Sequence, residues 1–431
     1  MAMIRVSSPE EICEAVRNVM QGDEIVVVDG HYSDWRVRVS CDKPVVIRPE
    51  HSDGATFSGE TSFQITGKDV VMRGLAFLDC RLTASVIALD GAVNCRVTAC
   101  RFEGASGKAP VVGISGQAAD NRVDHCTFIR PEARSVQVII NETSAPVRSR
   151  IDHNLFQDVP PIGGNGRETI QVGQSQPKWG RVEPLTVVEH NEFIRCDGEA
   201  EVISNKSSRN TYRHNLFKDC KGELVIRGAS HCLVEGNRFE NCSGGIRLSG
   251  THHRVVDNVI AGSKGTGIRL QYGMTVELGG LYQAVGHCLI AHNTVVNAGR
   301  AGILVGDGRD RDWGEKGIAN QAPYENRFVN NVIAGKAGTL LVVDRAPENR
   351  VERNLFYATG EATVSEAGAQ PRFADPLFVH PATGDYRLRP ESPALGTGLA
   401  LAPDGEASDI GASAGPVLAG PSVWPSGCAG L

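Results

Sequence analysis

The chain is poor in aromatic residues and carries no excess of positive charge. Phe, Trp and Tyr make up 6% of its 431 residues, and the formal net charge is -6. A nucleic-acid-binding protein normally has an excess of Lys and Arg, so this composition argues against a nucleic-acid partner. An anionic sugar chain is not excluded, because it needs only a local basic groove.

Disulfide pairing and membrane spans are also not indicated. The 12 cysteines include no Cys-x-x-Cys pair and many close short strands, which predicts buried free thiols rather than a disulfide framework. No apolar run approaches the roughly 18 residues of a membrane span. The segment 1–21 lacks the apolar centre of a secretion signal. We therefore expect neither a membrane partner nor a signal peptide in this chain.

An Asn that is followed two residues later by Phe or an aliphatic residue recurs along the chain. Neighbouring copies lie 37, 24, 22, 21, 35, 38 and 23 residues apart, so the base repeat is 21 to 24 residues with three longer insertions. The repeat has no continuous helical periodicity and contains short apolar strands between Gly, Asn and Ser turns. The repeating residues are Asn154, Asn191, Asn215, Asn237, Asn258, Asn293, Asn331 and Asn354.

Three short strands per repeat, stacked in register, predict an all-β fold: a single right-handed parallel β-helix. Ser8, Pro9 and Glu11 have the spacing of a helix N-terminus, so we expect a short capping α-helix within residues 1–22. Such a helix would cover the unpaired edge of the first coil. The β-helix would then occupy residues 23–414, followed by a loose tail over 415–431.

Several charged residues gather within one or two repeats. In a coil of 21 to 24 residues, positions one repeat apart lie roughly 4.8 Å apart on neighbouring rungs. Lys206 and Arg227 are 21 residues apart, and Glu199 and Glu201 project from the same side of an extended segment. Arg227, Arg247 and Arg269 follow at similar intervals, so we expect one column of guanidinium groups that binds carboxylates.

This set of residue types suits the removal of a proton beside the carboxylate of a uronate. The reaction builds a second negative charge on that carboxylate, which a hard cation can neutralise. Asn165, Glu199 and Glu201 supply the oxygen ligands that calcium prefers. Lys206 would act as the base and Arg227 as the proton donor to the departing oxygen.

At these residues the sequence resembles polysaccharide lyase family 6, the alginate lyases and chondroitinase B. The likeness covers most of the chain and is most specific at the spacing from the Glu-Ala-Glu run to Lys206 and to Arg227 one coil later. The resemblance implies a uronate polysaccharide lyase that requires Ca2+, with alginate as the first substrate and dermatan sulfate or chondroitin as others. The further matching segments are 165–170, 198–208, 222–227 and 245–248 with His252 and His253.

Two positions depart from the family pattern. Gly228 follows the proton donor where many members have His, and Gln171 follows Ile170 where they often have Arg. We therefore expect substrate contacts that differ from those of a typical alginate lyase. The predicted substrate-binding residues are Arg247, Arg269, His252, His253 and Gln171.

Two other functions stay open at this point. A glycoside hydrolase on the same scaffold would need paired carboxylic acids at a defined separation, and a non-catalytic β-helix could bind glycans. The loop from Asp307 to Trp313 either lines a sugar subsite or is an exposed insertion without a role. The resemblance implies a secreted or periplasmic protein, the lack of a signal leaves the cytoplasm open, and the oligomeric state stays undetermined.

Overall fold

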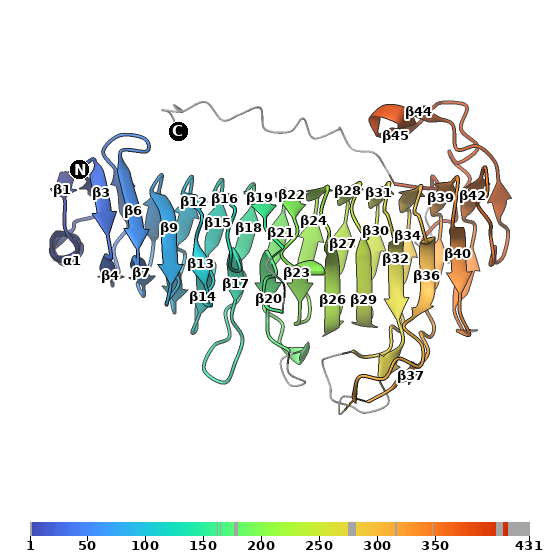
Figure 1. The fold of residues 1–431 in the computed structure, drawn as a ribbon, viewed down its shortest axis with the longest axis horizontal. Helices are drawn as coiled ribbons and strands as arrows, with labels where there is room; N and C mark the ends of the chain where they lie inside the picture. The colour runs from blue at the N-terminus through green and yellow to red at the C-terminus, as the bar shows by residue number, and fades with distance from the viewer. Residues whose placement is uncertain are drawn as a thin grey trace.

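The chain forms one elongated parallel β-helix in which short strands stack coil on coil (Figure 1). The computed structural model describes residues 2–161, 163, 165–175, 180–274, 282–314, 317–346, 348–401 and 408–412. Nearly every strand pairs in parallel with the equivalent strand of the coil before it and the coil after it. The predicted parallel β-helix is confirmed, whereas the predicted tail over 415–431 lies outside the described residues.

Three long sheets form the faces of the β-helix, and a complete coil contributes one strand to each. The 12-stranded sheet, which carries the candidate site, consists of β4 (Arg36–Val39), β7 (Ser62–Ile65), β10 (Ile87–Asp90), β14 (Val112–Ser115), β17 (Val136–Val138), β20 (Ile170–Val172), β23 (Glu201–Asn205), β26 (Glu223–Ser230), β29 (Ile246–Thr251), β32 (Thr266–Gln271), β36 (Ala301–Asp307) and β40 (Thr339–Val343).

The other two sheets flank it. The 14-stranded sheet consists of β1 (Met3–Val6), β2 (Glu24–Val27), β5 (Val45–Pro49), β8 (Val70–Arg73), β11 (Arg96–Thr98), β15 (Arg122–Asp124), β18 (Arg150–Asp152), β21 (Val187–Glu189), β24 (Thr211–Arg213), β27 (Leu233–Glu235), β30 (Arg254–Val256), β34 (Leu289–Ala291), β38 (Arg327–Val329) and β41 (Arg350–Glu352). The 15-stranded sheet consists of β3 (Gly30–Ser33), β6 (Ala55–Gly59), β9 (Ala76–Leu82), β12 (Arg101–Glu103), β13 (Ser106–Gly107), β16 (Thr127–Ile129), β19 (Leu155–Val159), β22 (Glu192–Cys196), β25 (Leu216–Lys218), β28 (Arg238–Glu240), β31 (Val259–Ala261), β35 (Thr294–Val296), β39 (Val332–Gly335), β42 (Leu355–Ala358) and β43 (Arg372–Phe373).

The helix α1 (Pro9–Asn18) caps the first coil as predicted. The Ser8 hydroxyl accepts a hydrogen bond from the backbone N–H of Glu11 at 3.2 Å, which satisfies one of the free amides at the helix start. Ile12 and Val16 are buried against the first coil. The strand β1 precedes the helix and pairs with β2, so the segment 1–22 also supplies the first strand of a sheet. Among the described residues, no helix has the length and apolar character needed to cross a bilayer.

The repeating Asn residues form a ladder inside the β-helix, which explains the sequence repeat. From Asn154 to Asn354, each side-chain N–H donates to the side-chain oxygen of the next Asn at 2.8 to 3.0 Å. The backbone N–H of each of these donor Asn residues donates to the same oxygen, so every side-chain oxygen that follows in the ladder accepts two hydrogen bonds. Beside the ladder, Phe rings from Phe57 to Phe239 stack with centroids 4.4 to 5.2 Å apart.

The histidines that precede a repeating Asn lie in turns, and the predicted buried free thiols are confirmed. His153, His190, His214 and His292 have φ between 53° and 55°, a left-handed conformation typical of turns. The first three stack ring on ring. Among the described residues, all eleven cysteines are free thiols, and only Cys13 is not fully buried.

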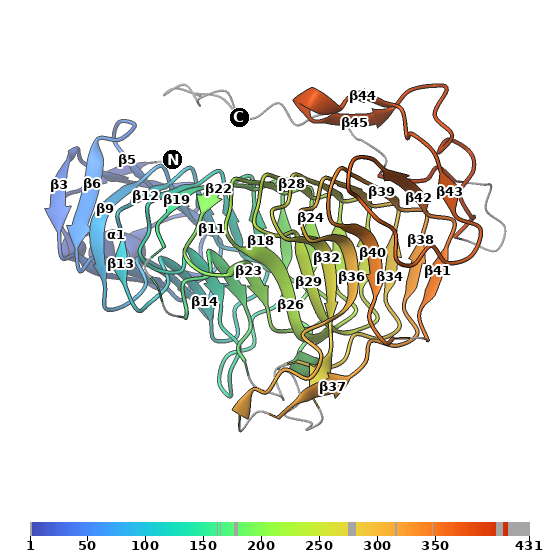
Figure 2. The same cartoon turned by 45° about the vertical axis from the view of Figure 1, so that its right-hand side comes forward.

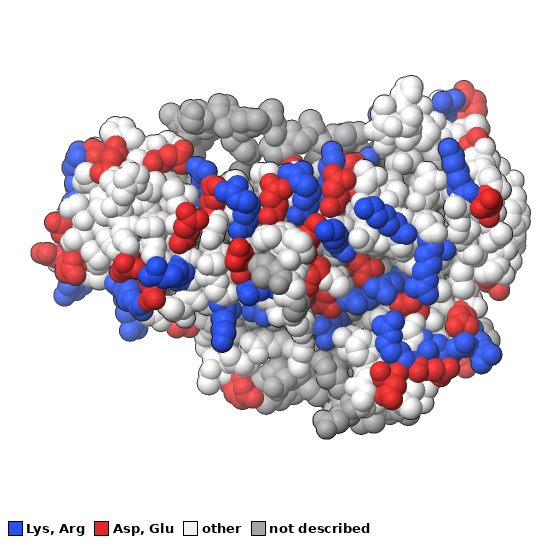
Figure 3. All heavy atoms as spheres, in the orientation of Figure 1, with Lys and Arg blue, Asp and Glu red and all other residues white. Residues whose placement is uncertain are grey.

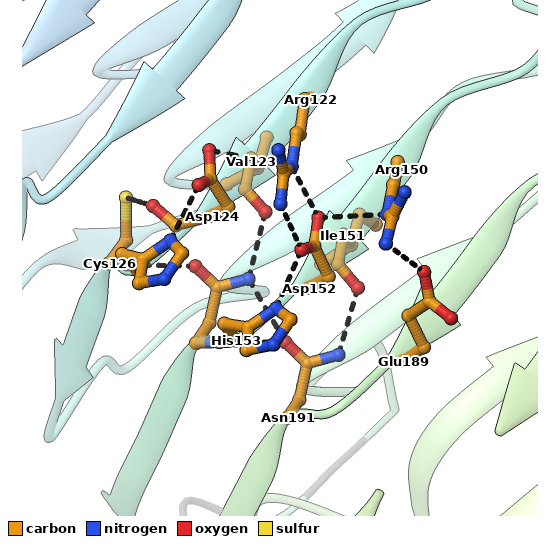
Figure 4. Close-up of polar contacts among 12 residues, drawn as sticks. Arg122, Val123, Asp124, Cys126, Arg150, Ile151, Asp152, His153, Glu189 and Asn191 are labelled. Atoms are coloured by element: carbon orange, nitrogen blue, oxygen red, sulfur yellow. Dashed lines mark hydrogen bonds and ion pairs between the residues drawn. The ribbon is translucent and has the colours of Figure 1, made fainter. Parts of the chain in front are cut away.

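Charges of both signs alternate along the outside of the β-helix (Figure 3). On the 14-stranded sheet, Arg122 donates to the buried Asp152 through two hydrogen bonds of 2.8 and 2.6 Å, and Arg150 pairs with Glu189 at 2.6 Å (Figure 4). Burial alone would raise the pKa of Asp152, but hydrogen bonds from Arg122 and His153, together with the charges of Arg122 and Arg150, lower it. This face is therefore a structural ion-pair network rather than a basic groove.

Four long connections, residues 139–149, 173–186, 272–288 and 308–326, each follow a strand of the 12-stranded sheet. The described parts of these connections lie along one edge of the β-helix (Figures 1 and 2). Within the last two, β33 (Gly273–Met274) pairs antiparallel with β37 (Ala319–Gln321). At the C-terminal end, the hairpin of β44 (Phe378–His380) and β45 (Asp385–Leu388) encloses a 3-10 turn at Pro381–Thr383.

Candidate active site

The candidate site lies on the outer face of the 12-stranded sheet, over β20, β23, β26, β29 and β32 (Figure 1). Side chains of alternate residues in a strand point to opposite faces. Ile203 belongs to the buried core, so Ser204 and Lys206 face outward. Asn205 is in register with Ile226, which places Lys206 and Arg227 at equivalent positions of neighbouring coils. The predicted one-coil relation of these two residues therefore holds.

Lys206 forms a buried ion pair with Glu168. Its Nζ lies 2.8 Å from Glu168 Oε1, and the two side chains are 6% and 3% exposed. Arg134 Nε donates to the other Glu168 oxygen at 3.0 Å. Burial alone would raise the pKa of Glu168, but the charge and hydrogen bond of Lys206, together with the charge of Arg134, lower it instead. Glu168 is therefore an ionised carboxylate that fixes the Lys206 side chain.

These side chains open onto a pocket of about 490 Å³. Its wall contains the predicted residues Asn165, Gln171 and Lys206, so three residues that the sequence singled out do meet. Asn165 is exposed, whereas Gln171 is buried and donates from its Nε2 to the Gly173 carbonyl oxygen at 2.7 Å. The full lining consists of Arg134, Gln137, Asn165, Gly166, Glu168, Gln171, Gln174, Ser175 and Lys206.

Three carboxylates lie close enough together to hold one cation. Glu168, Glu199 and Glu201 each offer an oxygen, and these oxygens lie within 4.8 Å of one another. Burial raises the pKa of Glu199 and the charges of Glu168 and Glu201 raise it further, although backbone N–H groups of Arg167 and Gly166 oppose this. A calcium ion would relieve this repulsion, and carboxylate oxygens are its preferred ligands. The residues therefore fit the predicted ion, and the sequence analysis missed Glu168 as a possible ligand.

Glu201 connects the acidic cluster to the arginines. Its Oε1 lies 2.5 Å from Arg247 Nη2 and 3.4 Å from Arg227 Nη1, and its Oε2 accepts a hydrogen bond from the Ser204 hydroxyl. All of these side chains are largely buried. Lys206 and Arg227 thus approach the same acidic cluster from neighbouring coils.

The predicted column of three arginines is wrong in its register. Arg247 is directly opposite Arg269 on the next strand, but Val225, not Arg227, is opposite Arg247. Arg227 lies two residues further along β26, beside an irregularity of the ladder between Ile226 and Ala229. The reason is that Arg227 and Arg247 are 20 residues apart, whereas the local coil is 22 residues long.

Arg247 and Arg269 belong to a row of alternating charges. Arg269 binds Glu223 through two hydrogen bonds and Asp307 at 2.6 Å, and Arg247 Nε lies 3.7 Å from Glu223. The Arg247 and Arg269 side chains are 13% and 19% exposed. Both face outward from the 12-stranded sheet, but a substrate carboxylate would have to share them with these acids.

His253 does not reach the surface, which corrects its prediction as a substrate contact. Its side chain is fully buried, its Nδ1 accepts from the Cys232 N–H at 3.2 Å, and its Nε2 lies 3.3 Å from the Ser249 carbonyl oxygen. Burial lowers its pKa to about 4. In other coils an Asn occupies the same inward position, and its side-chain oxygen accepts a hydrogen bond from a backbone N–H of the preceding coil. These residues are Asn121, Asn210 and Asn326.

His252 is exposed but belongs to a turn. It has a φ of 59°, and its ring stacks between His231 and His287 at 4.7 and 4.9 Å. Burial, with the neighbouring imidazoles, lowers its pKa. No described contact links this ring to Lys206, Arg227 or the acidic cluster, so its substrate role remains a prediction.

Comparisons with known proteins give matches over most of the chain. A model of the chondroitinase B family matches residues 6–356. The solved structure of the PL6 family alginate lyase AlyGC is 27% identical with a TM-score of 0.77, and the match covers 86% of this chain and 53% of AlyGC. This chain thus spans about half the length of that lyase.

Other solved structures match over most of both chains. A mannuronic acid specific family 6 lyase from human gut microbiota is 28% identical with a TM-score of 0.76, covering 88% of this chain and 92% of that one. A PL6 family polysaccharide lyase from Pseudopedobacter saltans, at 22% identity and a TM-score of 0.71 over 90% and 97%, supports the fold alone. A search of curated protein sequences gives no match.

Proposed function

Because the chain belongs to the chondroitinase B family, polysaccharide lyase family 6, we propose that it cleaves a uronate-containing polysaccharide by β-elimination. Alginate is the substrate class that we favour, since the two relatives at 27% and 28% identity are described as an alginate lyase and a mannuronic acid specific lyase. Dermatan sulfate and chondroitin are the other uronate polymers to test.

The proposed reaction uses Lys206 and Arg227 as a base and an acid. Lys206 Nζ, once neutral, takes the proton from C5 of the uronate, and the electron pair forms a double bond between C4 and C5. The bond from C4 to the glycosidic oxygen breaks, and Arg227 donates a proton to that oxygen. The product is an unsaturated uronate end.

The acidic cluster would hold the ion that the reaction needs. Glu168, Glu199 and Glu201 each offer an oxygen to one cation, and Glu168 and Asn165 line the pocket. Bound there, calcium would supply positive charge to the uronate carboxylate while its neighbouring carbon loses a proton. Gln171 lines the same pocket on the adjacent strand, which suits a contact to the sugar.

One observation carries the proposal: Lys206 and Arg227 contact two acids of the same cluster from equivalent positions of adjacent coils. Neither a hydrolase nor a glycan-binding module needs a lysine in that place. The low pKa of Glu168 also makes it a poor general acid for glycoside hydrolysis.

The test is a panel of polymannuronate, polyguluronate, alginate, dermatan sulfate and chondroitin sulfate, incubated with the purified chain and calcium. We expect ultraviolet absorbance from the new double bond with at least one polymer, and products of matching mass. Products with saturated ends would identify a hydrolase instead. Binding without turnover on every polymer would identify a glycan-binding β-helix and end the lyase proposal.

A further inference from the structure

Two insertions of the β-helix meet beside Arg227. The first joins β32 to β34 and the second joins β36 to β38, and the pairing of β33 with β37 connects them. The first insertion is also fastened to β29, because the Gln283 carbonyl oxygen accepts from the Ser249 hydroxyl at 2.7 Å and from the Gly250 N–H at 3.3 Å. The backbone around Tyr282 is therefore anchored one coil beyond Arg227.

The side chains of these insertions form a layered stack on Arg227. The Arg227 guanidinium carbon lies 4.8 Å from the centre of the Tyr282 ring. The Tyr282 ring in turn stacks on Trp313 with centroids 5.1 Å apart and planes 16° apart. The Arg311 guanidinium lies 5.4 Å from the Trp313 ring. Each of the two stacked rings thus contacts one guanidinium group.

Arg227 has few other contacts that fix its orientation. Its hydrogen bond to Glu201 is long, at 3.4 Å, although the Arg227 side chain is only 12% exposed. Its Nε has no hydrogen-bond partner among the described residues. A guanidinium that donates a proton must be held in one plane against the leaving oxygen, because misplacement of a reacting group is costly. The ring face of Tyr282 is the contact that can define this plane.

We propose that Tyr282 is a positioning residue for Arg227 and that Trp313 supports the Tyr282 ring. This inference rests on the proposed lyase function and extends it. The Tyr282 ring contacts both Arg227 and Trp313, which links the Arg227 guanidinium to the loop from Asp307 to Trp313. Trp313 therefore acts through Tyr282, which assigns a role to the loop from Asp307 to Trp313.

The kinetic test compares four variants on the substrate that the panel identifies. Tyr282→Leu removes the ring and should lower kcat about 2- to 30-fold with little change in KM, the range that a cation–π contact supports. Tyr282→Phe keeps the ring and should stay within about twofold of the wild type. Trp313→Leu should give a smaller loss than Tyr282→Leu. Tyr324→Leu is the matched control, because that ring packs on His287.

A readout independent of activity is the side-chain NMR signal of Arg227. Its Nε–H resonance can be assigned by its disappearance in Arg227→Lys. We expect a ring-current shift that is lost in Tyr282→Leu and kept in Tyr282→Phe. An unchanged resonance in Tyr282→Leu, or a rise in KM with kcat intact, would overturn the positioning role.

The two proposals fail in different ways. A wild-type chain that is inactive on every uronate polymer removes the lyase function, and with it any role in positioning a proton donor. An active wild type in which Tyr282→Leu has the kcat of the wild type removes the positioning role alone.

Discussion

Replacing Lys206 with Met separates the proposed catalytic role of this residue from its structural role. Met keeps much of the length of the side chain but cannot accept a proton or pair with Glu168. The substitution leaves Glu168, which is 3% exposed, with Arg134 as its remaining cation. We expect a loss of kcat of about 100-fold or more, the lower bound for removing a general base.

The same substitution should also destabilise the fold by a defined amount. Breaking a buried ion pair from one side costs about 3–5 kcal/mol, and the remaining bond to Arg134 places this case near the lower end. In Lys206→Met/Glu168→Gln the uncompensated carboxylate is gone, so about 1–2 kcal/mol of stability should return through the coupling of the two sites. Activity should not return.

Urea unfolding and initial rates on the identified polymer measure these two effects. Lys218→Met serves as the matched control, because Lys218 is exposed on β25 of the 15-stranded sheet. Lys206→Met with wild-type kcat would refute the assignment of the base. A double variant destabilised by the sum of the two single changes would refute the view that Lys206 and Glu168 form an energetic pair.

Three further outcomes are expected. Excess chelator should abolish turnover until calcium is restored, and Glu199→Gln should weaken calcium binding measured by calorimetry; full activity in chelator would contradict the metal role. Burial lowers the pKa of His253 to about 4 in the folded protein, against about 6.5 in the unfolded chain. The free energy of unfolding of the wild type should therefore fall by up to about 3 kcal/mol as the pH falls from about 6.5 to about 4. In urea unfolding at the same pH values, His253→Asn should lack this pH-dependent loss of stability. If the free energy of unfolding of His253→Asn depends on pH as that of the wild type does, the role of His253 is refuted. Asn215→Ala should lower the free energy of unfolding by about 3 kcal/mol or more in the same assay. The reason is that the backbone N–H and the side-chain Nδ2 of Asn191 both lose their acceptor. A loss of stability below about 1 kcal/mol would show that the hydrogen bonds of the ladder are not individually stabilising.

The coil length and the one-coil relation of Lys206 and Arg227 could be predicted from the sequence because both depend on one regular spacing. The Asn repeat corresponds to a real ladder of hydrogen bonds, so its interval measures the length of a coil. Lys206 and Arg227 lie in consecutive coils without an insertion between β23 and β26. Sequence distance therefore converts directly into spatial distance there.

Prediction failed where a shift of one or two residues decides the outcome. His252 and His253 are adjacent, so they face opposite sides, and only the register shows which one is inside. The signal was present, because other coils place Asn at the inward position of His253. The same sensitivity explains the two-residue offset between Arg227 and Arg247, which the irregularity in β26 accommodates.

Glu168 escaped prediction for a different reason. Glu168 lies just before β20, between the repeating residues Asn154 and Asn191, which are 37 residues apart. It contacts Lys206, which follows it by 38 residues in the chain. With a long insertion in between, interval counting cannot align it with Glu199 and Glu201. Its place among the conspicuous Asn-Gly-Arg-Glu residues was the available clue.

The four long connections that leave the 12-stranded sheet have a consequence for how this protein can change. The Asn ladder passes each of the three insertions within its span without a break, so the pitch of the β-helix does not depend on their length. Loops at that edge can be exchanged, shortened or extended while Lys206 and Arg227 keep their separation. The connections that carry Tyr282 and Trp313 would have to be kept for the proposed positioning of Arg227, but a change in the length of the connection over 139–149 would leave the stacking of the coils unchanged.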